Sequence, residues 1–315
     1  MKISIGRQHS AFAGAHWPKF SRGLGLSRGS GLSAAVFLIA ATITCSGLSA
    51  AGDMEGTKGQ KTEIPFDLYN GNLIIVKATV GSVENLNFIV DTGTSPSAIS
   101  TEMADRLRVR GETETLQTLN GHIQAQIIIL PHIQIGTLSA DSIRVAVQDL
   151  SFMERSLGIS LGGIAGLDIL STGSFTIDYR KRKIIFGAVA SNAKQIRFET
   201  QVPLLTVTVK VEGQEVRLLL DSGTWGLLVY RNRFRTAQDL RFDPNAWIST
   251  AGGMTHVRWL RAGVSLGKEN LGSRNIGIAD IDPDPQNNFD GLLGFAKMGF
   301  RKVSFDFENG LFGWE

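Results

Sequence analysis

The chain is dominated by short apolar runs separated by turn-forming residues. Short runs rich in Val, Ile, Leu and Phe, bounded by such residues, are typical of β-strands. Strands are predicted at Leu73–Val80, Ile127–Ile135, Ile143–Val147, Leu204–Val211 and Val303–Phe307. No long stretch has the apolar period of an amphipathic helix. Only two short charged segments fit a helix, Thr101–Leu107 and Arg231–Gln238. We therefore predict an all-β fold.

Two apolar runs end in the same short motif. Phe88–Thr94 reads Phe-Ile-Val-Asp-Thr-Gly-Thr, and Leu218–Thr224 reads Leu-Leu-Leu-Asp-Ser-Gly-Thr. One such motif alone fits an ordinary turn, because Asp, Ser, Thr and Gly all form turns. A carboxylate at the end of a buried strand is costly, however, unless it is paired or used. Two carboxylates in matching contexts therefore suggest that Asp91 and Asp221 meet.

The surroundings of the two motifs repeat at matched spacing. Gly166 follows Asp91 by 75 residues, and Gly294 follows Asp221 by 73 residues. Each of these glycines follows two small or apolar residues. The chain thus contains two copies of one unit of about 120 residues, which is an ordinary domain size. We place the two lobes at residues 62–190 and 200–315.

These features resemble the two-lobed aspartic peptidases of the pepsin and retropepsin type, and bacterial retropepsin-like peptidases with fused lobes in particular. The resemblance extends from about Pro65 to Trp314. It is carried by Asp91-Thr92-Gly93, Asp221-Ser222-Gly223, Ile164-Ala165-Gly166 and Leu292-Leu293-Gly294, and Gly166–Leu170 is similar to the Gly-x-Asp/Asn-Leu-Leu segment of retroviral peptidases. The resemblance implies two pseudo-symmetric β-barrel lobes with a central cleft.

Asp91 and Asp221 are the predicted catalytic pair. Two carboxylates about 3 Å apart cannot both ionise, so they share one proton. One carboxylate can then take a proton from water while the other donates to the scissile carbonyl. The resemblance implies supporting hydrogen bonds from Thr92, Gly93, Thr94, Ser222, Gly223 and Thr224. We expect a coupled titration and an activity optimum on the acid side of neutral.

Two hairpins are candidate flaps over the cleft. Leu119–Ile123 contains Asn-Gly, a strong hairpin signal, and Thr250–Met254 holds the equivalent place in the second copy. The candidate flap residues are Asn120, Gly121, His122, Gly252 and Gly253. Neither hairpin contains a Tyr, so the pepsin flap-Tyr role is not assigned. Trp225 is expected in the core, with a pocket wall as the alternative.

The N-terminus predicts export. Residues 1–51 hold five basic residues and no acidic residue, a dense apolar run at Leu32–Thr44, and small residues at the end. This pattern fits a cleaved export signal, with an uncleaved membrane anchor through residues 31–51 as the alternative. We expect a periplasmic or extracellular protein, free or membrane-anchored.

Charge and cysteine content exclude several classes of function. Removing the five basic leader residues leaves 27 basic and 29 acidic residues, about −2. A nucleic-acid partner would need a basic folded part and is excluded on this ground. The single cysteine, Cys45, lies in the leader, so the mature chain has no disulfide and no thiol nucleophile.

Other carboxylates and histidines are weaker candidates. Asp280–Asp284 imitates a calcium loop, but Pro285 and Gly291 occupy the positions that need Gly and Glu. No metal-ligand spacing is found among His122, His132 and His256. We expect neither a metal nor a cofactor. Asp168, Asp178 and Asp306 are predicted to bond backbone N–H groups at strands or turns.

The function predicted from the sequence is that of an aspartic endopeptidase. It would act as a monomer on a polypeptide held in the cleft as an extended strand. Two other classes stay open: a non-catalytic exported peptide-binding module on the same fold, and a β-barrel that binds small apolar ligands. The presence of both aspartates favours the enzyme, and the barrel leaves the twin motifs unexplained.

Overall fold

The computed structural model describes residues 62–190, 194–201, 204–236, 241–250, 253–283, 285 and 287–315, together with the strand backbone at 36–37 and 41–42. Apart from those two strands, the predicted leader lies outside the described residues, as does the flap candidate Gly252. The predicted all-β class is confirmed, because strands far exceed helices among the described residues.

Lobe one, residues 62–190, is built on a nine-stranded sheet. Its apolar runs form strands because branched side chains pack well on a pleated surface. The order is β2 (Ala41–Thr42), β8 (Glu112–Thr118), β9 (Gly121–Ile135), β10 (Leu138–Gln148), β7 (Ala98–Ser100), β11 (Gly163–Ala165), β6 (Val83–Val90), β5 (Leu73–Val80) and β4 (Asp67–Tyr69). An additional pairing of β9 with β5 curls the sheet on itself.

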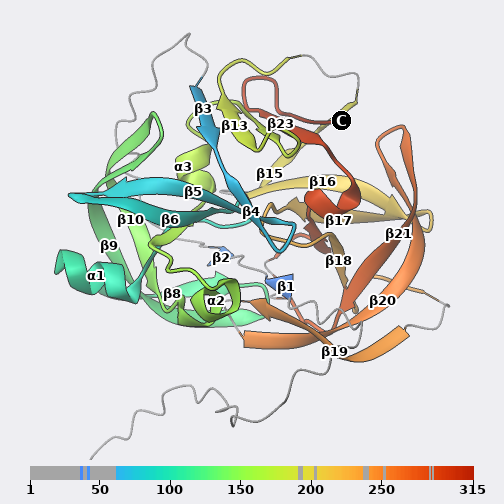
Figure 1. Cartoon of the computed structure of the whole chain (residues 1–315). Coiled ribbons are helices and arrows are strands. Elements are labelled where there is room, and N and C mark those ends of the chain that lie inside the picture. Colours follow the sequence, from blue (N-terminus) through green and yellow to red (C-terminus); the bar gives the residue numbers. More distant parts are fainter. Residues whose placement is uncertain are drawn as a thin grey trace, which may run out of the picture. The chain divides into compact units, whose positions relative to one another are not determined.

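The sheet of lobe two repeats this topology strand for strand. Its order is β1 (Val36–Phe37), β19 (Arg241–Thr250), β20 (Gly253–Leu266), β21 (Glu269–Ala279), β18 (Leu227–Tyr230), β22 (Gly291–Leu293), β17 (Gln214–Leu220), β16 (Leu204–Val211) and β15 (Glu199–Gln201). The additional pairing of β20 with β16 matches that of β9 with β5. The weak sequence repeat therefore reflects two copies of one strand order, drawn in cyan to green and in yellow to orange in Figure 1.

A third sheet of six strands contains strands of both lobes. Its order is β14 (Gln195–Arg197), β24 (Leu311–Trp314), β23 (Lys302–Asp306), β12 (Phe175–Asp178), β13 (Lys183–Phe186) and β3 (Thr62–Pro65). The pairing of β12 with β23 joins the lobes, with Phe175 opposite Phe305 and their rings 4.7 Å apart. The two lobes thus belong to one compact unit.

The described helices are short. They are α1 (Thr101–Leu107), α2 (Ser151–Leu157), α3 (Leu167–Leu170) and the 3-10 turn η1 (Ala296–Met298). The predicted helix at Thr101–Leu107 is confirmed: Ser100 caps it by accepting the Met103 N–H at 3.1 Å, and it ends at Arg108, which is left-handed with φ 55°. None of the helices in the described part of the chain is long and apolar enough to cross a membrane.

The second predicted helix, Arg231–Gln238, is wrong over its described part. Residues 231–236 form a turn followed by irregular chain. The side chain of Gln214 bonds the carbonyl of Arg233 at 3.1 Å and the N–H of Arg235 at 3.3 Å. A helix would need those backbone groups for its own ladder, so tertiary contacts override local propensity here.

The described residues form three buried apolar clusters. The largest extends through both lobes and includes the phenylalanines of the third sheet. A lobe-one cluster contains Leu73, Ile89 and Leu116, and a lobe-two cluster contains Leu219, Tyr230 and Leu292. The lobe-two cluster also includes Leu119, which comes from the lobe-one hairpin and is only 1% exposed. This hairpin therefore packs against the opposite lobe.

Candidate active site

The two motifs lie at the ends of equivalent strands. Asp91 follows β6 directly and donates its N–H to the carbonyl of Ala165 at 3.0 Å; Asp221 follows β17 and donates to Leu293 at 3.1 Å. In each lobe the apolar-apolar-Gly strand, β11 or β22, runs parallel to the strand that ends at the aspartate. Both carboxyl groups are fully buried, because the apolar runs place the strand ends inside the molecule.

Reciprocal hydrogen bonds tie the two motif loops together across the lobes. The Thr92 hydroxyl donates to the Leu220 carbonyl at 2.9 Å and accepts the Ser222 N–H at 3.0 Å. The Ser222 hydroxyl donates to the Val90 carbonyl and accepts the Thr92 N–H, both at 3.0 Å. Each hydroxyl thus uses its donor and its acceptor, and the loops are held in one register.

Each carboxyl group accepts hydrogen bonds from its own loop. Asp91 accepts the Gly93 N–H at 2.9 Å and the Thr94 hydroxyl at 2.9 Å. Asp221 accepts the Gly223 N–H at 2.7 Å, the Thr224 N–H at 2.9 Å and the Thr224 hydroxyl at 2.6 Å. The corresponding donors lie closer to Asp221, which favours its ionised form.

The motif glycines show how closely the two loops approach. A Cβ atom on Gly93 would lie 2.6 Å from Cγ of Asp221, and one on Gly223 would lie 3.0 Å from Oδ2 of Asp91. Each glycine therefore lies against the carboxyl group of the other lobe. Only a residue without a side chain fits between the two loops, and the structure brings Asp91 and Asp221 together.

The electrostatics match a pair that shares one proton. Burial raises the pKa of Asp91 well above its usual range, and the negative charge of Asp221 raises it further. Burial also raises the pKa of Asp221, against the hydrogen bonds from Thr224 and from the Asp91 side chain. Both pKa values are raised, so the pair holds one shared proton, and the shorter donor contacts of Asp221 favour the ionised form of that residue.

A further set of hydrogen bonds and close contacts, behind the carboxyl pair, fixes the loop that contains Thr94. The Asp168 carboxylate accepts the N–H and the hydroxyl of Ser97 at 2.9 and 2.6 Å, and the Ser97 hydroxyl accepts the Gly166 N–H at 2.8 Å. A Cβ on Gly166 would lie 2.4 Å from the Thr94 carbonyl oxygen, and one on Gly294 would lie 2.2 Å from that of Thr224. The apolar-apolar-Gly motifs therefore pack against the aspartate loops at equivalent points.

Sequence reasoning missed two residues of this region. The Asn72 side chain, 4% exposed, donates from Nδ2 to the Gly223 carbonyl at 2.9 Å and so holds the second motif from lobe one. Ser97 links Asp168 to Gly166 as described. In the sequence, Asn72 is visible only as part of an Asn-Gly-Asn turn, and Ser97 only as a polar residue near the motif.

The remaining sequence-predicted carboxylates have the expected roles. Asp178 accepts the Lys181 N–H at 2.8 Å, and Asp306 accepts the Asn309 N–H at 3.1 Å. Asp168 accepts the Ser97 N–H, so the prediction that all three bond backbone N–H groups is confirmed. Asp280 pairs with Arg231 and Arg258, each at 3.2 Å, so its charge is balanced by protein groups.

The two candidate flaps are matching hairpins. Thr118 pairs with Gly121, and Thr250 pairs with Gly253 at the equivalent place in lobe two. In both hairpins the Thr hydroxyl lies 2.9 Å from the carbonyl oxygen of that Gly. Gly121 and Gly253 have φ values of 137° and 123°, which other residues rarely adopt. His122 follows the first turn, opposite Gln117, and is exposed.

The hairpin tips contact each other. The Thr250 hydroxyl of lobe two donates to Oδ1 of Asn120 in lobe one at 2.8 Å. The neighbouring Leu119 packs in the lobe-two cluster. Trp225 is half-buried against the same cluster, with its ring 5.5 Å from that of Trp259. Among the described residues, the flap candidates of the two lobes are thus joined by a polar contact, and the lobe-one hairpin also packs in the lobe-two cluster.

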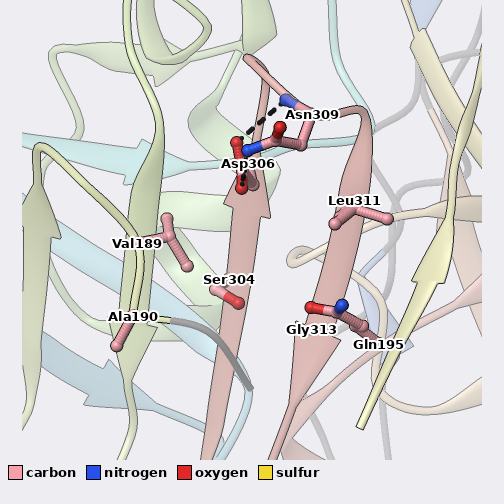
Figure 2. Close-up of a pocket in the computed structure, with 8 residues that line it drawn as sticks. All are labelled: Val189, Ala190, Gln195, Ser304, Asp306, Asn309, Leu311 and Gly313. Atoms are coloured by element: carbon pink, nitrogen blue, oxygen red, sulfur yellow. Dashed lines mark hydrogen bonds between the residues drawn. The ribbon is translucent and has the colours of Figure 1, made fainter. Parts of the chain in front are cut away.

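A separate cavity of about 190 Å³ lies on the third sheet, over β23 and β24. Figure 2 shows Asp306 and Asn309 at its edge, hydrogen-bonded to each other at 2.8 Å. Its lining contains no residue of the two aspartate motifs. The cavity is therefore distinct from the carboxyl pair.

A comparison with known families agrees with this geometry. Residues 76–169 match the model of a family described as aspartyl protease. The matched part contains Asp91-Thr92-Gly93 and Gly166 in lobe one, and it ends before the second motif. No curated protein matches the chain. The family match supports aspartic peptidase chemistry in general for the lobe-one motif.

Proposed function

We propose that this chain is an aspartic endopeptidase in which each of two retropepsin-like lobes supplies one carboxyl group. The observation that carries the proposal is the pair of buried aspartates whose loops are locked by reciprocal Thr92 and Ser222 hydrogen bonds. Burying two carboxyl groups together is costly in a purely structural role. A reaction that needs a proton donor and a proton acceptor side by side accounts for the arrangement.

The proposed chemistry uses one water molecule. Asp221, ionised, takes a proton from the water, and the water oxygen forms a bond to the carbonyl carbon of the peptide. Asp91 gives its proton to the carbonyl oxygen, so the intermediate is a neutral diol. Asp221 then passes its proton to the leaving nitrogen, the C–N bond breaks, and Asp91 recovers a proton from the diol. Both carboxyl groups return to their initial states.

The substrate is proposed to be a polypeptide bound in extended form beneath the two hairpins. We also propose that the protein acts outside the cytoplasm as a monomer, following the export pattern of residues 1–51. The alternative, a non-catalytic peptide-binding module, leaves the shared proton without a use. It remains a defined outcome of the test below.

The test is digestion of an unfolded protein between pH 3 and pH 8, followed by mass spectrometry of the products. Asp91→Asn and Asp221→Asn should each lose at least about 10³-fold in turnover, because one half of the acid–base pair is removed. Asp306→Asn, which alters a turn carboxylate on the third sheet, should remain within about twofold of the parent. Equal turnover by Asp91→Asn and the parent removes the pair from the mechanism. Peptide binding without cleavage by the parent supports the binding module.

A further inference from the structure

The side chain of Gln117 is buried without a partner for its donor. Gln117 is 4% exposed, and its Nε2 atom has no hydrogen-bond partner within the described structure. A buried carboxamide donor is normally satisfied, since leaving it unpaired is costly. An unpaired donor in native structure therefore calls for an acceptor that arrives from outside, such as a ligand.

The strand geometry indicates where this side chain faces. Gln117 is the second-last residue of β8, and alternate residues of a strand face opposite sides. Leu116 faces the lobe-one cluster. Leu119, two residues beyond Gln117, packs in the lobe-two cluster. Gln117 therefore faces away from the lobe-one cluster, and the turn that follows it packs against lobe two.

The backbone edge of β8 beside Gln117 can pair with an extended chain. One edge of β8 pairs with β9, and the other pairs antiparallel with β2, placing Thr42 opposite Gln117 and Ala41 opposite Thr118. The equivalent edge of β19 in lobe two pairs with β1. Both strands that occupy these edges come from the N-terminal leader, whose removal is predicted from the sequence. Removal would leave an unpaired edge beside Gln117, which is a template for a peptide strand.

We propose that Gln117 is a specificity-determining residue that donates from Nε2 to a polar side chain of the bound peptide. This inference rests on the proposed function and deepens it. Directly opposed residues of paired strands have side chains on the same face, with Cβ atoms about 4.5–5.5 Å apart. The peptide residue opposite Gln117 thus presents its side chain to the carboxamide. The favoured residues carry an oxygen acceptor: Asn, Gln, Ser, Thr, Asp or Glu.

The experiment is a digest of a peptide library by the parent and by Gln117→Met, with cleavage sites mapped by mass spectrometry. Met preserves the length of the side chain and removes the donor. Gln124→Met is the matched control, because Gln124 lies on the same hairpin, is exposed, and bonds only locally to Thr115 at 2.7 Å in the described contacts. Gln117→Leu is a second variant, used in case the Met side chain changes the packing around position 117.

The parent should show one subsite enriched in acceptor side chains by about tenfold over Leu, the effect of one satisfied buried donor. Gln117→Met and Gln117→Leu should lose that preference at the same subsite, and Gln124→Met should keep it. An unchanged profile in both Gln117 variants overturns the inference while leaving the proposed function intact. If the parent cleaves nothing, the proposed function fails, and peptide binding to Asp91→Asn by fluorescence anisotropy decides the inference. Equal affinity for acceptor and Leu peptides in that assay overturns it.

Discussion

Thr92→Val tests whether the interlobe hydrogen bonds hold the two carboxyl groups together. Valine keeps the shape of threonine and removes the hydroxyl. The variant loses the bond to the Leu220 carbonyl, and it leaves the Ser222 N–H without its acceptor in a site where Ser222 is 1% exposed. An unpaired buried donor costs about 1–3 kcal/mol, and the lost bond adds about 1 kcal/mol. We expect the unfolding free energy to fall by about 2–4 kcal/mol, a large share of ordinary domain stability.

The assay is urea unfolding followed by intrinsic fluorescence. Ser222→Ala should lower the unfolding free energy by a similar amount, because it removes the reciprocal pair of bonds. The double variant should cost less than the sum of the single variants, with a coupling energy of about 0.5–3 kcal/mol. Thr115→Val, which alters an exposed threonine of β8, should stay within about 0.5 kcal/mol of the parent. A change below about 0.5 kcal/mol in Thr92→Val, or strict additivity in the double variant, refutes the reasoning.

The remaining predictions concern protons and the flap contact. The pH profile of kcat/KM should be bell-shaped: activity rises as Asp221 ionises and falls as Asp91 loses its proton, and the raised pKa of Asp91 keeps that proton bound well above its ordinary titration range. A profile that rises through neutral pH without a decline contradicts this. Because its folded pKa is raised, Asp91 contributes stability below its unfolded pKa of about 3.9 and loses it as pH rises through the folded value. The unfolding free energy of the parent should therefore fall relative to Asp91→Asn above about pH 4, as measured by urea titrations at several pH values; a constant difference between the two proteins would be inconsistent with a raised pKa. Asn120→Ala removes the interlobe acceptor of the Thr250 hydroxyl and leaves the Gly253 carbonyl oxygen of its own hairpin. Amide exchange at both hairpin tips should then become about tenfold faster, and unchanged exchange would show that the interlobe contact does not hold the tips.

Strand positions and the identity of the carboxyl pair could be predicted from the sequence. The strands at Leu73–Val80 and Leu204–Val211 have the predicted bounds, since continuous apolar runs leave little choice of register. Asp91 and Asp221 could be paired in advance because each ends a buried run and each is followed by the same turn residues. A hairpin at Leu119–Ile123 was predictable from its Asn-Gly pair, although the structure places the two turn residues at Leu119 and Asn120 and makes Gly121 the first residue of β9.

Features that depend on how the two lobes meet could not be predicted. Asn72 and Thr250 are ordinary polar residues until the opposite lobe supplies a carbonyl or an amide oxygen within 2.9 Å. Gln117 is likewise unremarkable in a polar strand sequence, and its burial comes from the surroundings rather than from its neighbours in the chain. The predicted helix at Arg231–Gln238 was wrong because a side chain of β17, Gln214, captures its backbone groups. Local sequence carries no information about such a partner.

Divergence between the two lobes explains why the carboxyl pair can be asymmetric. In a perfectly symmetric pair, the proton would have equal affinity for either carboxyl group, and neither residue would be committed as acid or base. Here the two copies have diverged, and the hydroxyl of Thr224 lies 2.6 Å from its carboxylate, whereas that of Thr94 lies 2.9 Å away. The Gly223 N–H is likewise closer than its Gly93 counterpart, at 2.7 against 2.9 Å. Shorter donor contacts stabilise a carboxylate more strongly. Covalent fusion of the lobes therefore permits the proposed division of roles, in which Asp221 is the base and Asp91 is the acid.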